Sequence, residues 1–107
     1  MQHKGIKVGE DYFLGKLDEN GKPSGKGTMM YASGDVYKGQ LKSGQRHGKG
    51  KQITSNNSTF EGDFENDKPH GFGIFIWSSN DYFESYEGQW DMGVPNGTGT
   101  IKYTNAS

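Results

Sequence analysis

The fold of this chain is decided by a stretch that reads YKGQLKSGQRHGKG from Tyr37 to Gly50. Near-copies of it read YFLGKLDENGKPSGKG from Tyr12, FEGDFENDKPHGFG from Phe60 and YEGQWDMGVPNGTG from Tyr86. Aligned on their aromatic-x-Gly cores, which start at Phe13, Tyr37, Phe60 and Tyr86, the copies recur at spacings of 24, 23 and 26 residues. A unit this short cannot bury a core alone, so its neighbours must stabilise it. The sequence therefore predicts a solenoid.

Within each copy, apolar residues and glycines alternate with polar ones, which predicts a strand with one buried face. Turn residues follow, and a Gly-x-Gly pair opens a second strand. We expect an all-β, elongated solenoid of about four stacked β-hairpins, with eight strands in one twisted antiparallel sheet. It forms a single domain over 1–107, with repeats at about 12–35, 36–58, 59–84 and 85–107. The predicted repeat core comprises Phe13, Gly15, Leu17, Tyr37, Gly39, Leu41, Phe60, Gly62, Phe64, Tyr86, Gly88 and Trp90.

The paired glycines at the start of each second strand need a reason, because glycine inside a strand costs stability. The pairs are Gly25/Gly27, Gly48/Gly50, Gly71/Gly73 and Gly97/Gly99. Two glycines at i and i+2 clear a strip on one face of the sheet, where a ring from an adjacent strand can lie flat. We therefore expect the repeated glycines and the repeated aromatic residues to pack on each other.

The composition limits the class of protein. Apolar residues make up 29% of the chain, so we expect a thin core built from its aromatic rings. The net charge of -1 gives no global attraction for nucleic acid, and no nucleic-acid partner is expected. The absence of cysteine excludes disulfides and thiolate metal sites. No signal peptide and no 18-residue apolar span is recognised, so a cytoplasmic location is the expectation.

The repeated pattern, Tyr-x-Gly-x-(Trp/Leu/Phe) followed by (His/Asn)-Gly-x-Gly, resembles the MORN repeat, the membrane occupation and recognition nexus motif. The second, third and fourth copies match it at His47-Gly48, His70-Gly71 and Asn96-Gly97. The first copy departs from it, with an extra residue in its turn and Ser24 in place of His or Asn. The resemblance covers roughly residues 12–104. It implies a scaffold in cytoskeletal, ciliary or membrane-contact assemblies, and members also occur attached to lipid kinases and to a lysine methyltransferase.

Candidate chemistry is sparse. His47 and His70 hold equivalent positions in their repeats, but no third ligand stands at a fixed spacing, so no metal site is expected. Glu61, Asp63 and Glu65 alternate on the face opposite Phe60, where carboxylates form a solvated surface. No nucleophile, phosphate-binding or acid/base motif is present. We expect no catalytic residues, no cofactor and no enzymatic activity.

Charge is segregated by repeat. Residues 36–58 carry five basic side chains and no acid, which gives +5, while residues 59–85 carry six acids against Lys68, which gives -5. We favour the interpretation that these neighbouring blocks neutralise each other across the strands. The alternative is a basic stripe for phosphoinositide or other anionic lipid headgroups, and its residues would be Lys38, Lys42, Arg46, Lys49 and Lys51.

The third repeat carries apolar side chains on both faces of its second strand, and both cannot be inside a single sheet. Such a patch marks an interaction site, unless the insertion that lengthens the following spacing folds back and covers it. The candidate partner-binding residues are Phe72, Ile74, Ile76, Trp77, Tyr82, Phe83 and Trp90.

These observations favour a non-enzymatic scaffold that presents an aromatic-lined sheet surface to an apolar or amphipathic segment of a partner protein. Two alternatives stay open: a peripheral membrane-binding module, and an accessory repeat segment of a larger enzyme. The location is then cytoplasmic, at the cytoskeleton or at a membrane periphery. Open sheet edges also raise the hypothesis of self-association.

Overall fold

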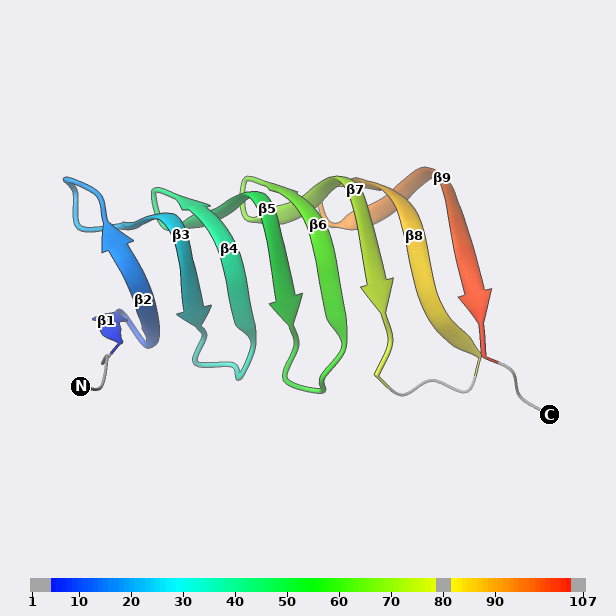
Figure 1. The fold of residues 1–107 in the computed structure, drawn as a ribbon, viewed down its shortest axis with the longest axis horizontal. Helices are drawn as coiled ribbons and strands as arrows, with labels where there is room; N and C mark the ends of the chain where they lie inside the picture. Colours follow the sequence, from blue (N-terminus) through cyan, green and yellow to red (C-terminus); the bar gives the residue numbers. More distant parts are fainter. Residues whose placement is uncertain (1–4, 79–81, 105–107) are drawn as a thin grey trace.

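The computed structural model describes residues 5–78 and 82–104, and Figure 1 shows them as a single antiparallel sheet in which every strand pairs with the next one along the chain. The molecule measures 50 × 28 × 22 Å. All regular elements of the described residues are strands, which confirms the all-β hairpin solenoid. The strands are β1 (Ile6–Val8), β2 (Asp11–Leu17), β3 (Pro23–Met30), β4 (Val36–Lys42), β5 (Gln45–Ile53), β6 (Thr59–Glu65), β7 (Lys68–Ile76), β8 (Phe83–Asp91) and β9 (Val94–Tyr103).

The repeats correspond to the hairpins β2–β3, β4–β5, β6–β7 and β8–β9, and β1 is a ninth strand that pairs with β2 over only three residues. The last three hairpins close through two-residue turns at Ser43-Gly44, Asn66-Asp67 and Met92-Gly93. Both central residues of each have positive φ, the geometry that fits the twist of a hairpin. The first turn is longer, as its extra residue indicated, and Asp18 accepts the amides of Asn20 and Lys22.

One glycine of each predicted pair belongs to a continuous row across the sheet. Gly27, Gly39, Gly50, Gly62, Gly73, Gly88 and Gly99 stand opposite one another from β3 to β9. A Cβ at Gly50 would lie 2.1 Å from Tyr37 Oη, and one at Gly73 would lie 2.3 Å from Phe60 Cζ. The rings therefore lie flat on this row, as predicted.

The other glycine of each pair has a different role, and the expectation that both make room for the ring is wrong. Gly25 and Gly97 have φ of 76°, and a Cβ on either would meet nothing within 4 Å. They are glycines because their backbone is left-handed. Register shifts between Gly39 and Leu41, at the same place in the third and fourth hairpins and one residue earlier in the first, mark bulges in the second strand of each hairpin, and bulges bend strands.

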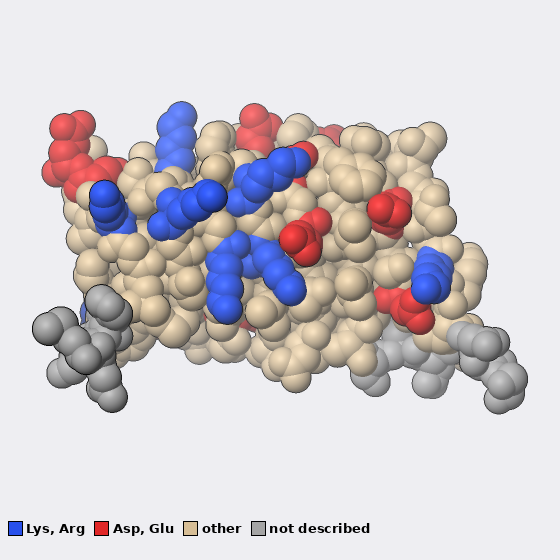
Figure 2. Space-filling model, viewed as in Figure 1, with Lys and Arg blue, Asp and Glu red and all other residues tan. Residues whose placement is uncertain are grey.

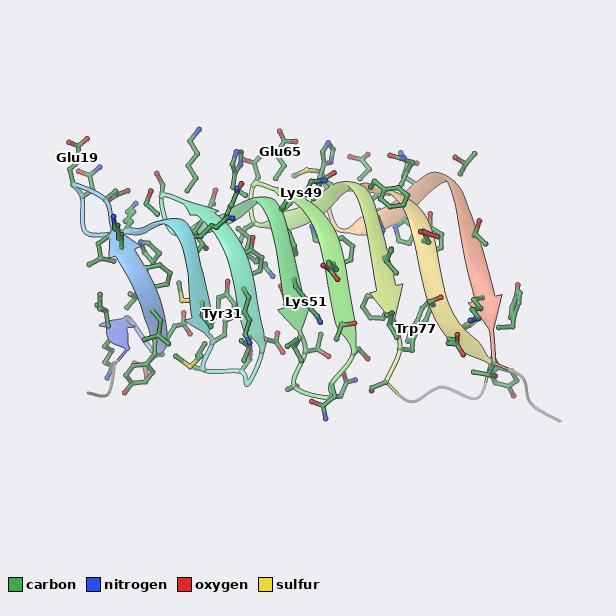
Figure 3. The ribbon with its side chains drawn as sticks, viewed as in Figure 1. Glu19, Tyr31, Lys49, Lys51, Glu65 and Trp77 are labelled. Carbon is green, nitrogen blue, oxygen red and sulfur yellow. The ribbon has the colours of Figure 1, made fainter. Side chains whose placement is uncertain are left out.

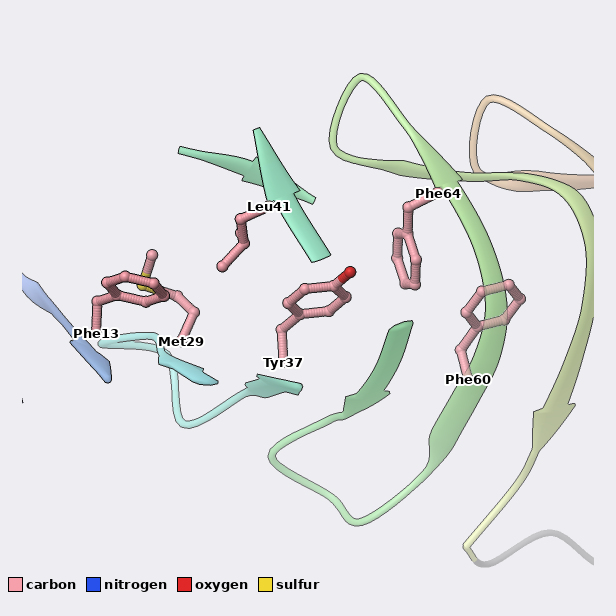
Figure 4. Packing of buried hydrophobic residues seen from close by; sticks show 6 residues of the cluster. All are labelled: Phe13, Met29, Tyr37, Leu41, Phe60 and Phe64. Atoms are coloured by element: carbon pink, nitrogen blue, oxygen red, sulfur yellow. The ribbon is translucent and has the colours of Figure 1, made fainter. Parts of the chain in front are cut away.

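The rings form a core one layer thick, part of which Figure 4 shows. Its buried residues are Phe13, Met29, Tyr37, Leu41, Phe60 and Phe64. Successive rings meet edge-on: Tyr37 and Phe64 are 5.1 Å apart between centroids, and Phe64 and Phe60 are 5.2 Å apart. Edge-to-face contact is a preferred arrangement of aromatic rings. Each repeat is thus stabilised through side chains of the next.

Leu17 departs from the predicted core, because its side chain is 39% exposed. It stands where Leu41, Phe64 and Trp90 stand in the later repeats, and these pack against the ring of the preceding repeat. Among the described residues, the strand in front of β2 is β1, which pairs with residues 11–13 and stops short of Leu17. The position is right for the core, but no described residue covers it.

Hydrogen bonds also link the hairpin turns. The amide of Gly44 donates to Pro23 O at 2.9 Å, that of Asp67 to Arg46 O at 3.1 Å and that of Gly93 to Pro69 O at 2.8 Å. Each acceptor begins or nearly begins the second strand of a repeat. The equivalent acceptor in the last repeat is the carbonyl of Pro95.

Candidate functional site

The aromatic face continues beyond the buried core toward the C-terminal edge of the sheet. Trp90 contacts the rings of Phe60 at 5.0 Å and Tyr86 at 5.5 Å, and its indole Nε1 donates to Gly73 O at 3.2 Å. Phe75 and Trp77 meet at 5.0 Å, and Trp77 meets Phe83 at 5.5 Å. These rings are therefore held in fixed orientations although several remain partly exposed.

An apolar hollow of about 260 Å³ opens among these rings. Its walls come from β8, β9 and the chain just after β7, and its lining residues are Trp77, Phe83, Tyr86, Trp90, Pro95 and Ile101. A second hollow of about 180 Å³ lies on the other side of Trp90, between Phe60, Phe75 and Arg46. The two hollows share Trp90 as a wall, and we call them together the aromatic groove. We call the first of them the terminal hollow.

The terminal hollow lies where a side chain of a following repeat would pack, although the ring of Tyr86 is only 8% exposed because Trp90 contacts it. In the earlier repeats, the ring on the glycine row contacts a residue two strands further on, as Tyr37 contacts Phe64 and Phe60 contacts Trp90. Tyr86 lies on Gly99 in the same way, because a Cβ added at Gly99 would lie only 2.3 Å from Tyr86 Oη. No described strand follows β9, so the place of the capping side chain is open.

The predicted partner-binding residues divide between the two faces of the sheet. Trp77, Phe83 and Trp90 line the terminal hollow. Phe72, Ile74 and Ile76 lie on the opposite face, where each is paired with a polar residue of β8. Tyr82 is 72% exposed at the start of β8. The expected single patch is therefore two surfaces, of which only one is a groove.

The insertion after the third repeat was the alternative cover for Phe72 and Ile76. Residues 79–81 lie outside the described residues, but Phe83, at its far end, packs on Trp77 and Tyr103 of the aromatic face. Phe72 and Ile76 are each nearly half exposed. The described end of the insertion thus covers the groove side and leaves these two side chains open.

The basic side chains do not form one stripe. Lys38, Lys49 and Lys51 border a wide, shallow depression of about 700 Å³ on the face opposite the rings, together with Lys26 and Glu61. Figure 2 shows this face, with most of the blue side chains over its N-terminal half and red ones both at the N-terminal end and further along, and Figure 3 labels Lys49 and Lys51 on β5. Lys42 lies instead beside Gln45 and His47 near the hairpin turn.

Charge neutralisation across the strands is present at two points. Lys49 Nζ lies 2.6 Å from Asp63 Oδ1, and Arg46 Nε lies 2.7 Å from Asp67 Oδ1. Lys51 stands directly opposite Glu61 in the register of β5 and β6. The lysine-bordered depression is therefore only weakly positive as a whole.

A scan against protein-family models matches this chain to the MORN repeat at four consecutive places, residues 19–36, 37–59, 60–82 and 86–107. These matches cover most of the sequence. The chain belongs to the MORN repeat family. The second, third and fourth MORN matches begin at or next to the aromatic residues that lie on the glycine row, and the first match starts within the aberrant turn of the first hairpin. No curated protein matches the chain significantly.

Arg46 is the basic side chain whose place the sequence predicted wrongly. It points to the aromatic face of the MORN sheet, 17% exposed, with its guanidinium over the rings of Tyr31 at 5.7 Å and Phe64 at 5.5 Å. Its side chain also donates to Gln52 Oε1 and to the carbonyl of Asp67. It therefore cannot join Lys38 and Lys51 in a headgroup site. The other repeats carry proline at this position, as Pro23, Pro69 and Pro95, and that exception was the available signal.

The two repeat histidines lie apart from the groove. His70 is 3.3 Å from both Glu65 and Asp91, and its Nδ1 accepts the amide of Met92 at 3.2 Å. His47 is exposed near Lys42. Within residues 5–78 and 82–104, no three His, Asp or Glu side chains form a group suited to a metal ion. The described part of the chain also contains no helix able to span a membrane.

Two residues of the hollow were not anticipated. Pro95 and Ile101 belong to β9, whose sequence is rich in polar residues and in residues typical of turns. The signal was the alternation Gly97, Gly99, Ile101, which places Ile101 on the same face as the glycine row. Tyr86 was expected only as a core residue, but its ring also forms a wall of the terminal hollow.

Proposed function

We propose that this MORN protein is a non-enzymatic binding module, and that its aromatic groove accepts an apolar or amphipathic segment of a partner protein. The observation that supports the proposal most is the terminal hollow, an apolar pocket at the end of a row of rings. Apolar surface gathered in a concave place marks an interaction site rather than a solvated surface.

The chemistry of the walls suits protein recognition. Tyr and Trp bury large areas with few rotatable bonds, so they lose little conformational entropy when a partner binds. Trp90 is fixed by its hydrogen bond to Gly73 and by ring contacts on two sides. A partner therefore meets a preorganised surface. The groove's only formal charge is Arg46 at its inner end, already paired with Asp67.

Selection of peptide ligands tests the proposal without a known partner. A phage-displayed library of random 12-residue peptides is selected on the purified domain, and the affinity of the enriched peptides is measured by fluorescence anisotropy. We expect peptides with aromatic or aliphatic anchors. Trp77→Ala removes a wall of the hollow and Ile101→Asp places a carboxylate in it, and each should lower affinity at least tenfold.

The matched control is Ile76→Asp, because Ile76 is exposed to a similar extent, 47% against 41% for Ile101, but lies on the opposite face. It should leave peptide affinity unchanged. Selected peptides that lose affinity with Ile76→Asp and keep it with Ile101→Asp would place binding on the wrong face and refute the proposal. Failure to enrich any peptide over a blank surface would also count against it.

A second candidate function is peripheral binding to anionic lipid headgroups, favoured by the three lysines Lys26, Lys38 and Lys51 around one depression. The acidic residue Glu61 in the same depression, and the pairing of Lys49, weaken it. Flotation with vesicles containing phosphatidylinositol bisphosphate distinguishes the two. Flotation that is lost in Lys38→Glu/Lys51→Glu and retained in Ile101→Asp would establish the lipid function.

A further inference from the structure

The two ends of the sheet are complementary: one has an apolar hollow and the other has a partly exposed apolar side chain. At the C-terminal end, every residue of β9 is exposed and the terminal hollow opens beside the ring of Tyr86. At the N-terminal end, Leu17 is a capping-type side chain with no described ring in front of it. Figure 1 shows β9 and β2 near opposite ends of the long axis of the molecule.

Three internal junctions show what a strand beside β9 must look like. At each one, a glycine with positive φ stands opposite the capping residue, and the row glycines stand opposite each other. The pairs are Gly25↔Leu41 with Gly27↔Gly39, Gly48↔Phe64 with Gly50↔Gly62, and Gly71↔Trp90 with Gly73↔Gly88. Two residues further on, the aromatic residue of the new repeat stands opposite Met29, Gln52 or Phe75.

The same rule applied to β9 defines the incoming strand. It must run antiparallel to β9, with an apolar residue opposite Gly97, a glycine opposite Gly99 and an aromatic residue opposite Ile101. Its sequence is therefore aromatic-x-Gly-x-apolar. The β2 strand has this sequence, as Phe13-Leu14-Gly15-Lys16-Leu17, and its register shift against β3 lies one residue earlier in the repeat than the shift of β4 against β5.

We propose that β2 of a second copy of this chain adds to β9, head to tail, and that Leu17 of the incoming copy fills the terminal hollow. This inference rests on the proposed function, since it uses the same hollow, and it names the occupant. The open carbonyl of Pro95 then accepts an amide from the first turn of the incoming copy, as Pro23 and Pro69 do inside the sheet. Head-to-tail contacts do not close on themselves, so the product is an open series of oligomers.

The opposite face of the junction is compatible with this register. Thr98 stands beside Lys16 of the incoming copy, Thr100 beside Leu14 and Lys102 beside Tyr12. No two like charges face each other, and like charges directly opposite are what would destabilise a strand pair. The unpaired backbone groups of an edge strand supply the remaining attraction.

The short strand β1 competes with this addition. It pairs with Asp11, Tyr12 and Phe13 of its own β2, which are the residues that β9 of the neighbouring copy would meet. The pairing of β1 with β2 is weak, because β1 has three residues, of which only Val8 packs against the core cluster. The β1 strand is thus a removable cap that keeps the association reversible.

Sedimentation velocity over a concentration series measures the association. We expect the weight-average mass to rise above the monomer value of 11.8 kDa with a ladder of dimer, trimer and larger species. Leu17→Asp should raise the dissociation constant at least tenfold, and Val8→Asp should lower it by releasing β1. Ile76→Asp is the matched control on the other face and should change nothing.

Disulfide trapping tests the register, and the chain offers a clean background because it has no cysteine. A Lys16→Cys chain mixed with a Thr98→Cys chain should give a covalent heterodimer, because directly opposed residues lie within disulfide reach. Thr100→Cys in place of Thr98→Cys shifts the partner by two residues and should cross-link at least tenfold more slowly. An intrachain pair, Lys26→Cys/Gln40→Cys, reports the rate for the equivalent internal positions.

The outcomes separate the two proposals. A monomer at all concentrations, no heterodimer and no effect of Leu17→Asp would overturn the head-to-tail inference. If peptides selected in the earlier experiment still lose affinity with Ile101→Asp, the groove is a binding site for another protein and the proposed function stands. A symmetric Thr98→Cys homodimer that outcompetes the heterodimer would mean that β9 pairs with β9, and would also overturn the inference.

Discussion

The packing of rings on the glycine row predicts a large cost for one added methyl group at Gly50. A Cβ there would lie 2.1 Å from Tyr37 Oη and 2.4 Å from two ring carbons, against an ordinary carbon contact of about 3.5 to 4.0 Å. The ring of Tyr37 is fully buried, contacts Phe64 edge-on and donates a hydrogen bond to Gln40 O at 2.7 Å. It must therefore move by more than an ångström among close neighbours.

The magnitude of Gly50→Ala follows from three contributions. Overpacking costs about 1 to 3 kcal/mol, and loss of the Tyr37 hydrogen bond costs about 1 kcal/mol. The smaller entropy of the unfolded chain returns about 0.4 to 1 kcal/mol. The free energy of unfolding should fall by about 2 to 3 kcal/mol, which lowers the Tm of a domain of this size by about 10 to 20 °C. Urea unfolding followed by tryptophan fluorescence measures it.

A double-mutant cycle identifies the cause. Leucine at position 37 is too short to cover Gly50, so Gly50→Ala should cost less than about 1 kcal/mol in a Tyr37→Leu background. Gly21→Ala is the control for backbone strain alone, because Gly21 has φ of 79° and open space around its Cβ position; it should cost about 1 kcal/mol. An equal cost of Gly50→Ala in both backgrounds would refute the reasoning.

Three further predictions concern single side chains. Burial raises the pKa of Tyr37 from its ordinary value of 10.0 to about 12. The protonated form is then favoured in the folded state, so the free energy of unfolding is full below pH 10 and falls by about 2 to 3 kcal/mol as the pH rises to 12. Tyr37→Phe should flatten that slope in urea unfolding at pH 9 to 12, and an unchanged slope would contradict the assignment. Arg46→Ala should destabilise the fold by about 2 kcal/mol, since it removes a guanidinium that pairs with Asp67 and lies over the rings of Tyr31 and Phe64. Lys49→Ala removes an ion pair whose lysine side chain is 78% exposed, and it should cost under about 1 kcal/mol. Equal losses in chemical denaturation would disprove this ranking. Met92 has φ of 48° in a two-residue hairpin turn, so Met92→Asn should raise stability by about 0.5 to 1 kcal/mol and Met92→Ala should not; no gain in Tm for Met92→Asn would argue against strain at this turn.

Much of the fold could be predicted because each repeat contains the residues that determine its own hairpin. The alternation around Tyr37 and the turn at Ser43-Gly44 specify a hairpin locally, and the recurrence of both specifies stacking. Packing of the rings on glycine follows from the same spacing. The different roles of the two glycines in a pair could not be predicted, because a left-handed backbone and a close contact both appear in a sequence only as glycine.

The site was less predictable, because it depends on the face on which each side chain lies and on its contacts with other repeats. Phe72 and Trp77 are close in sequence and similar in chemistry, but strand alternation sends them to opposite faces, and the terminal hollow lies on the face of Trp77. Arg46 reads as one of five basic residues, although its position in the repeat is that of a proline facing the rings. Its partner Asp67 belongs to the next repeat, and composition alone does not connect them.

Stability and recognition have one physical origin in this molecule. Every ring on the glycine row is stabilised by a side chain from the following repeat, so an array with any number of repeats leaves its last ring uncapped and its first capping residue unused. In this chain these are Tyr86 and Leu17. A last ring that no following repeat packs against is at once an incomplete end of the array and a wall of the terminal hollow. For this reason the groove is lined by Tyr86 and Trp90, which are themselves repeat positions, and substitutions that improve the covering of Tyr86 within one chain should weaken its association with others.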